Sequence, residues 1–120
     1  MIETIVSLET AKLLKEKGFQ ERCRAYWHTI CELYTCQLSP CDYNNGIEFY
    51  ASAPTQSFAQ QWIREKGIHI GVYANASGWG WILTKCGGNG SCIKEIEDDT
   101  FFDTYEDALE EGLKQALKLI

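Results

Sequence analysis

Two turn segments in the second half of the chain constrain the fold most. Residues 75–78 and 87–91 are rich in Gly, Asn and Ser, which favour turns. They divide this part of the chain into three predicted strands, over residues 68–74, 79–85 and 93–97. Because short turns join neighbouring strands in opposite directions, the sequence predicts an antiparallel sheet here.

An apolar stripe at helical spacing follows these strands. Thr104 and Asp107 resemble a capping box, with Asp in place of the usual Glu. Gly112 falls on the stripe and costs a helix about 1 kcal/mol relative to Ala. We therefore expect Gly112 to let the helix lie close to the sheet. The stripe consists of Tyr105, Ala108, Leu109, Gly112, Leu113, Ala116, Leu117 and Ile120.

In the first half of the chain, fewer residues mark the ends of helices and strands. A helix is predicted over residues 7–17, capped by Ser7, and another over 56–66, ending at Gly67. The aromatic and β-branched run 24–36 predicts one long strand, and 47–53 predicts a second strand that pairs with it after a loop over 37–46.

The predicted order is therefore α-β-β-α-β-β-β-α. It indicates an α+β fold with a mainly antiparallel sheet and helices packed on one face. At 120 residues and 45% hydrophobic content, we expect a single domain over residues 1–120. There is no long apolar run and no cationic leader, so we expect no membrane contact and a cytoplasmic location.

Charge argues against direct binding of nucleic acid. The net charge is −6, and residues 94–120 hold nine acidic and three basic groups. Residues 55–118 share the α-β-β-β-α order of the double-stranded-RNA-binding domain, but Glu106 and Asp107 stand where that family is basic. Acidic surfaces repel phosphate, so one alternative is an acidic mimic that inhibits a DNA-binding protein. The acidic run lacks EF-hand spacing, and we predict no metal site there.

The six cysteines fall into two groups. Structural zinc sites use closer pairs than those in the first half of the chain, so we expect buried thiols there rather than a metal site. Cys86 and Cys92 flank a Gly-rich turn, and we predict a close thiol pair that is reduced in the cell, with a disulfide as the alternative after purification. The first group consists of Cys23, Cys31, Cys36 and Cys41.

No residue carries a catalytic signature. His28 and His69 are the only histidines, and each alternates with apolar residues on a predicted strand. The Gly-rich segment 86–92 leads into a strand and lacks the phosphate-loop pattern. We therefore predict no catalytic residue and no cofactor. The enzyme alternative is a small hydrolase or transferase that uses a Cys/His/acid site.

Aromatic residues give the best indication of a binding surface. Helices cover only one face of the predicted sheet, and exposed aromatic patches often mark interfaces. We predict an accessory protein that acts through a protein partner or a homodimer, using the open sheet face or an edge strand. The predicted surface consists of Tyr26, His28, Tyr34, Tyr50, His69 and Tyr73.

Three segments resemble a family of small uncharacterised bacterial and phage proteins with no assigned activity. They are SLETAKLLKEKGF at 7–19, APTQS at 53–57 continuing to Trp62, and TYEDALEEGL at 104–113. The resemblance implies a context in a bacterium, a prophage or another mobile element. It carries over no functional residues.

Overall fold

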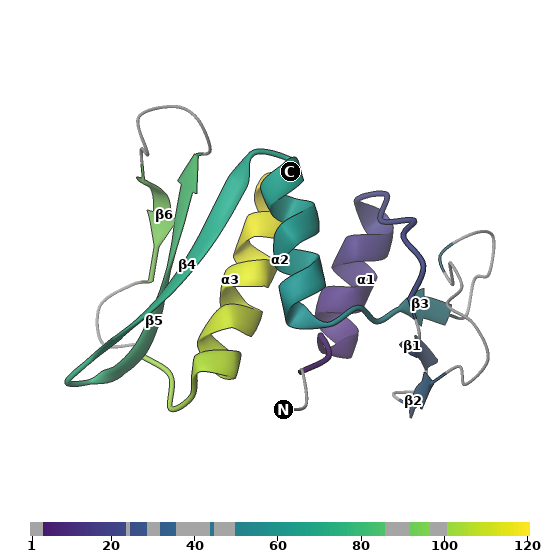
Figure 1. Cartoon of the computed structure of the whole chain (residues 1–120), viewed down its shortest axis with the longest axis horizontal. Helices are drawn as coiled ribbons and strands as arrows, with labels where there is room; N and C mark the ends of the chain where they lie inside the picture. Colours follow the sequence, from purple (N-terminus) through teal and green to yellow (C-terminus); the bar gives the residue numbers. More distant parts are fainter. Residues whose placement is uncertain are drawn as a thin grey trace. The chain divides into compact units, whose positions relative to one another are not determined.

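The computed structural model describes residues 4–23, 25–28, 32–35, 44, 50–85, 92–96 and 101–120. The chain forms two compact units, Met1–Thr55 and Gln56–Ile120 (Figure 1). The expectation of one domain over residues 1–120 remains a prediction.

The helices lie where the sequence places them. α1 spans Leu8–Glu16, α2 spans Gln56–Glu65 and α3 spans Tyr105–Leu119. Ser7 caps α1, since its Oγ accepts a hydrogen bond from the Thr10 N–H at 3.3 Å. In the described part of the chain, no helix combines the length and the apolar character that crossing a membrane requires.

The sheet of the first unit corrects one prediction. Residues 24–36 do not form a single strand, because β1 (Ala25–His28) and β2 (Glu32–Thr35) pair antiparallel. The run contains no Gly, Pro, Asn or Asp to mark a reversal. β3 (Tyr50–Ser52) pairs antiparallel with β1, as expected of the second strand, and the sheet order is β2-β1-β3.

Long-range hydrogen bonds hold the first unit together. The Trp27 Nε1–H donates to the carbonyl of Val6 at 2.9 Å. Asn44 donates from Nδ2 to the Phe19 carbonyl at 2.8 Å, and its Oδ1 accepts from the Ser52 N–H at 2.9 Å. Phe19, Val6 and Ser52 are fully buried, so these polar groups are paired inside the core.

The second unit has the order α-β-β-β-α. β4 (Ile68–Asn75), β5 (Gly78–Lys85) and β6 (Cys92–Glu95) form an antiparallel sheet in the order β4-β5-β6. α3 contacts β4 and β5, and α2 contacts β4 and α3, so both helices cover the same face (Figure 1). This confirms the predicted α+β class.

After β6, the backbone makes further hydrogen bonds to β5, on the side of β5 that faces away from β4. The Ile96 N–H donates to the Trp81 carbonyl at 3.1 Å. Trp79 and Phe102 exchange both backbone hydrogen bonds, at 2.8 and 2.9 Å. The backbone polar groups of both tryptophans therefore point away from β4.

Gly112 brings α3 against the sheet, as predicted. A Cβ at this position would lie 2.8 Å from Cγ2 of Ile70 and 3.3 Å from Cβ of Trp81. Ile70 and Trp81 are buried, together with Leu83 on β5 and Leu113 on α3. The core of this unit therefore lies between α3 and the strands that it covers.

Candidate interaction surface

The sheet of the second unit turns one face away from its helices. Ile70, Trp81 and Leu83 point toward the helices and are buried. Because side chains alternate along a strand, the residues between them point the other way. Their register pairs are His69 with Thr84, Gly71 with Ile82, and Tyr73 with Gly80. These six residues are called the open face below.

Two glycines shape the open face. The Tyr73 ring lies over Gly80, where an added Cβ would be 2.6 Å from the ring Cζ. Ile82 lies over Gly71, where an added Cβ would be 3.1 Å from Cγ2 of Ile82. Each large side chain therefore packs on the backbone of a glycine. The Tyr73 side chain nevertheless remains 37% exposed to solvent.

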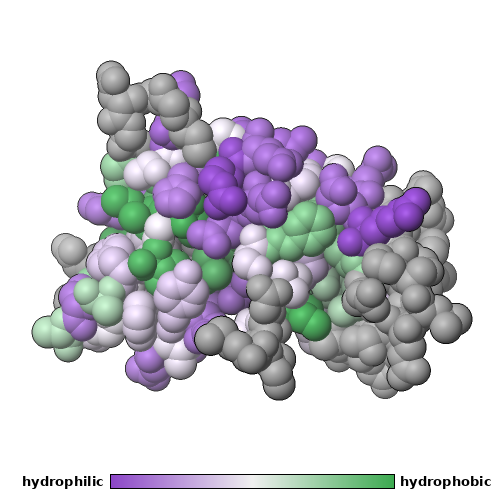
Figure 2. All heavy atoms as spheres, viewed as in Figure 1, coloured by the Kyte–Doolittle hydropathy of each residue, from purple (hydrophilic) through white to green (hydrophobic). Residues whose placement is uncertain are grey.

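Apolar side chains reach the surface of the second unit. Figure 2 shows apolar side chains at the surface over the strands of the second unit, at the left of the view. Ile93 on β6 is also exposed, at 43%. Exposed apolar and aromatic groups on a sheet are a feature of interfaces.

The outer edge of β4 offers unpaired backbone groups. Ala74 and Val72 are the register partners of Trp79 and Trp81, whose polar groups point away from β4. These are therefore non-hydrogen-bonded antiparallel pairs, in which both residues direct their N–H and C=O away from each other. Val72 and Ala74 therefore direct theirs outward, where β4 has no strand neighbour in the described part of the chain.

α2 covers only the first part of this edge. Ile70 also directs its carbonyl outward, and Gln60 of α2 donates to it from Nε2 at 2.7 Å. No such contact is made to Val72 or Ala74 by the residues that the structure describes. The stretch Val72, Tyr73, Ala74 and Asn75 is called the free β4 edge below.

The free β4 edge lacks the usual protection of an edge strand. Natural edges carry charged residues, Pro or β-bulges that prevent pairing with another chain. Residues 72–75 contain no charged residue and no Pro, and the β4–β5 register is regular throughout. The opposite edge strand is different: β6 is short, carries Lys94 and Glu95, and its pairing with β5 shifts register at Leu83/Thr84.

An open groove of about 280 Å³ lies between β6 and α3. Two hydrogen bonds join three of its polar side chains. The Lys94 Nζ donates to Oε1 of Gln115 at 2.7 Å, and Nε2 of Gln115 donates to Oε1 of Glu111 at 2.9 Å. Sequence reasoning missed this groove, because it depends on contacts between residues far apart in the chain. The lining residues are Trp81, Lys94, Glu95, Ile96, Phe102, Glu111 and Gln115.

Four residues of the predicted interaction surface belong to the first unit. Tyr26 is registered with Tyr34, and His28 with Tyr50. Tyr26 is half-buried, and the side chains of the other three are outside the described part. The remaining two, His69 and Tyr73, lie on the open face of the second unit and are exposed.

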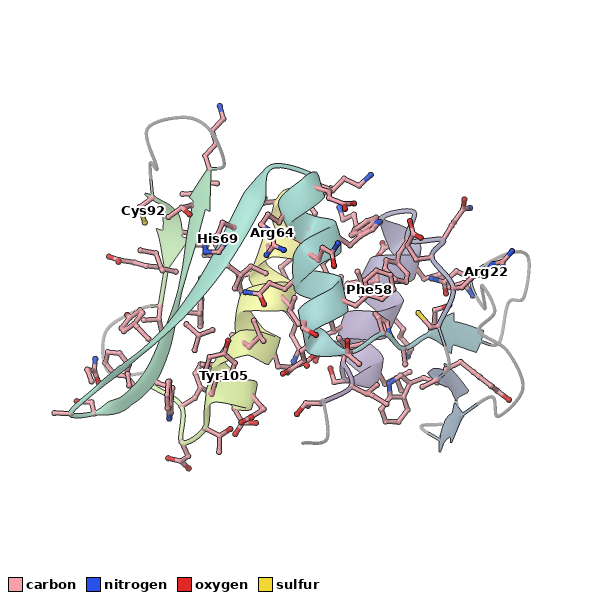
Figure 3. The ribbon with its side chains drawn as sticks, viewed as in Figure 1. Arg22, Phe58, Arg64, His69, Cys92 and Tyr105 are labelled. Carbon is pink, nitrogen blue, oxygen red and sulfur yellow. The ribbon has the colours of Figure 1, made fainter. Side chains whose placement is uncertain are left out.

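The predicted thiol groups are only partly described. Cys23 is buried, with its Sγ 3.7 Å from the Glu21 carbonyl. Cys92 is exposed on β6, two strands from His69 (Figure 3). Cys86 is outside the described residues, so the Cys86–Cys92 pair remains a prediction. Also outside the described residues are Cys31, Cys36 and Cys41.

No metal or catalytic cluster forms among the residues that the structure describes. No group of three or more His, Cys, Asp and Glu side chains there is close enough to hold a metal ion. Asp103, Glu106 and Asp107 are exposed around the start of α3. Thr104 Oγ1 accepts from the Asp107 N–H at 3.1 Å, as a helix cap does. These carboxylates therefore have a local role in stabilising the helix dipole.

The chain matches no protein-family model, no curated protein and no solved structure. The open face and the free β4 edge are the surfaces whose chemistry suits binding. One offers aromatic and apolar contacts, and the other offers unpaired backbone donors and acceptors.

Proposed function

We propose that this chain is a small accessory protein of a phage or other mobile element that acts by contact with another protein rather than by catalysis. The observation that carries the proposal is a β4 edge without charged residues or Pro, beside a sheet face that no helix in the described part of the second unit covers. A partner that adds a strand there gains backbone hydrogen bonds, and the open face supplies side-chain contacts.

The charge of the second unit favours a protein partner over a nucleic acid. Its α-β-β-β-α order matches that of an RNA-binding fold, but fold alone does not determine function. Asp103, Glu106 and Asp107 are exposed around the first turn of α3. Phosphate groups near this turn would meet three carboxylates, so direct nucleic-acid binding is disfavoured.

The proposal can be tested by native mass spectrometry of protein purified gently from its own host under reducing conditions. We expect a complex heavier than the 13.7 kDa chain. An Ile82→Lys variant places a charge at the centre of the open face and should lose that complex. A Gln61→Lys variant, at an exposed position on α2, is the matched control and should keep it.

Two outcomes would contradict the proposal. One is a wild-type protein recovered only as the bare chain. The other is a complex that the Ile82→Lys and Gln61→Lys variants retain equally, since the open face would then make no contact with the partner.

The exposed carboxylates at the start of α3 favour a second candidate function, an acidic mimic that occupies a basic groove of a DNA-binding protein. Contact between unlike charges weakens as salt screens them. Binding to such a protein should therefore fall steeply with ionic strength. Binding that is unchanged at high salt would eliminate this candidate.

A further inference from the structure

We propose that the strand added to the free β4 edge comes from a second copy of this chain. The two β4 strands would run antiparallel about a two-fold axis at Tyr73, joining both sheets into one. This inference rests on the proposed function, because it names the partner at the same surface.

The free hydrogen-bonding groups match this symmetry. Val72 and Ala74 both direct N–H and C=O outward, and they stand on either side of Tyr73. A two-fold axis at Tyr73 sets Val72 opposite Ala74 of the partner subunit, and Ala74 opposite Val72 of the partner subunit. In each such pair the two residues exchange both backbone hydrogen bonds, so the free groups are satisfied.

A register shifted so that the two-fold axis lies at Val72 fits the free backbone groups less well. An axis at Val72 would bring Ile70 into the new ladder, but the Ile70 carbonyl already accepts from Gln60 at 2.7 Å. The axis at Tyr73 keeps that bond and uses only the part of the edge that α2 leaves uncovered.

The side chains are also self-compatible. Tyr73 would face its own copy in a non-hydrogen-bonded pair, where Cα atoms approach to about 4.5 Å and aromatic pairs are favourable. Residues 71–75 contain no formal charge, so pairing two copies sets no like charges opposite each other, although the whole chain carries −6. An isologous contact requires such self-complementarity.

The register can be tested by exchanging charge at the axis. Tyr73→Lys alone and Tyr73→Glu alone would each set like charges opposite across the axis, and both variants should run as monomers. Mixing the two should restore a dimer that contains one copy of each, because residue 73 then pairs with the opposite charge. Wild type should have twice the mass of the 13.7 kDa chain in native mass spectrometry.

Gln61→Lys and Gln61→Glu are the matched controls. Gln61 is exposed on α2, outside both the open face and the free β4 edge, so both variants should dimerise alone. Circular dichroism of all four variants checks that each is folded before its mass is compared.

Amide hydrogen exchange gives an independent readout. As the concentration rises, the Val72 and Ala74 amides should become protected. The Tyr73 amide, which points toward β5, should be protected at every concentration. A wild-type monomer at all concentrations, or a dimer that persists equally in Tyr73→Lys and Tyr73→Glu, would overturn the inference. If the wild-type monomer still forms a complex that Ile82→Lys abolishes, the homodimer fails while the proposed function stands.

Discussion

The ring of Tyr73 lies over the α-carbon of Gly80, its register partner on β5. The ring occupies the space that a side chain at residue 80 would need, since an added Cβ would be 2.6 Å from Cζ. Gly80 therefore determines how closely Tyr73 lies against the sheet and how flat the open face is.

Replacing Gly80 by Ala should move the Tyr73 ring into solvent. Only the far end of a half-exposed side chain must shift, and a cross-strand pair contributes about 0.2–1 kcal/mol. The free energy of unfolding in urea should change by less than about 1 kcal/mol, while nitration of Tyr73, located by peptide mass spectrometry, should become faster. Unchanged nitration would show that the ring does not depend on Gly80.

Gly112→Ala should be more damaging, although Ala is the better helix former. The new methyl group would lie 2.8 Å from Cγ2 of the buried Ile70, and overpacking a core costs about 1–3 kcal/mol. The gain in helix propensity offsets about 1 kcal/mol of this cost. We expect a net loss of unfolding free energy, measured against Lys118→Ala at an exposed position of α3. A stabilised Gly112→Ala protein would contradict the close packing of α3.

Gly78→Ala and Gly67→Ala separate backbone strain from steric conflict. Both glycines have positive φ, 134° and 102°. An added Cβ at Gly78 would lie 2.6 Å from the Phe102 carbonyl oxygen, whereas at Gly67 it would meet nothing within 4 Å. Each substitution should cost about 1–3 kcal/mol of unfolding free energy from strain, with the larger loss for Gly78. Equal losses of unfolding free energy in urea would show that the Phe102 backbone moves aside at no energetic cost.

The helix caps offer a test of whether the two units unfold together. Ser7 caps α1 in the first unit and Thr104 caps α3 in the second. Ser7→Ala and Thr104→Ala should each cost about 1 kcal/mol. If the chain is one cooperative domain, calorimetry should show one transition that either variant shifts. Two transitions, each moved by one variant only, would refute the single-domain prediction.

Free-thiol titration tests the predicted thiol pair. With Cys86 and Cys92 close but reduced, unfolded protein prepared without reductant should show all six thiols. Four free thiols without reductant and six with it would instead indicate a disulfide. If that disulfide joins Cys86 and Cys92, the Cys92→Ser variant should show the same number of free thiols with and without reductant.

Local signals made the helices predictable. Ser7, Thr104 and Gly67 mark helix ends through interactions within a few residues, and the apolar stripe of α3 identifies its buried face. The alternation along 68–74 likewise predicted that His69 and Tyr73 would point away from Ile70. These features depend on neighbours in sequence, so sequence reasoning was sufficient.

Longer-range features were not predictable in this way. The reversal between β1 and β2 has no turn residue to mark it, and strand propensity is equally satisfied by one strand or two. The free β4 edge depends on which backbone groups Trp79 and Trp81 direct toward Phe102 and Ile96. The groove depends on Lys94 reaching Gln115, which only the folded sheet and helix bring together.

The difference between the two edges of the β4-β5-β6 sheet bears on how far assembly can proceed. Polymer growth by strand addition needs two adhesive edges on every subunit. Here Lys94, Glu95 and the register shift protect β6, while residues 72–75 leave β4 unprotected. In the proposed dimer each β4-β5-β6 sheet uses its one unprotected edge in the pair, so growth through this sheet would end as a closed pair and would not extend into a fibre.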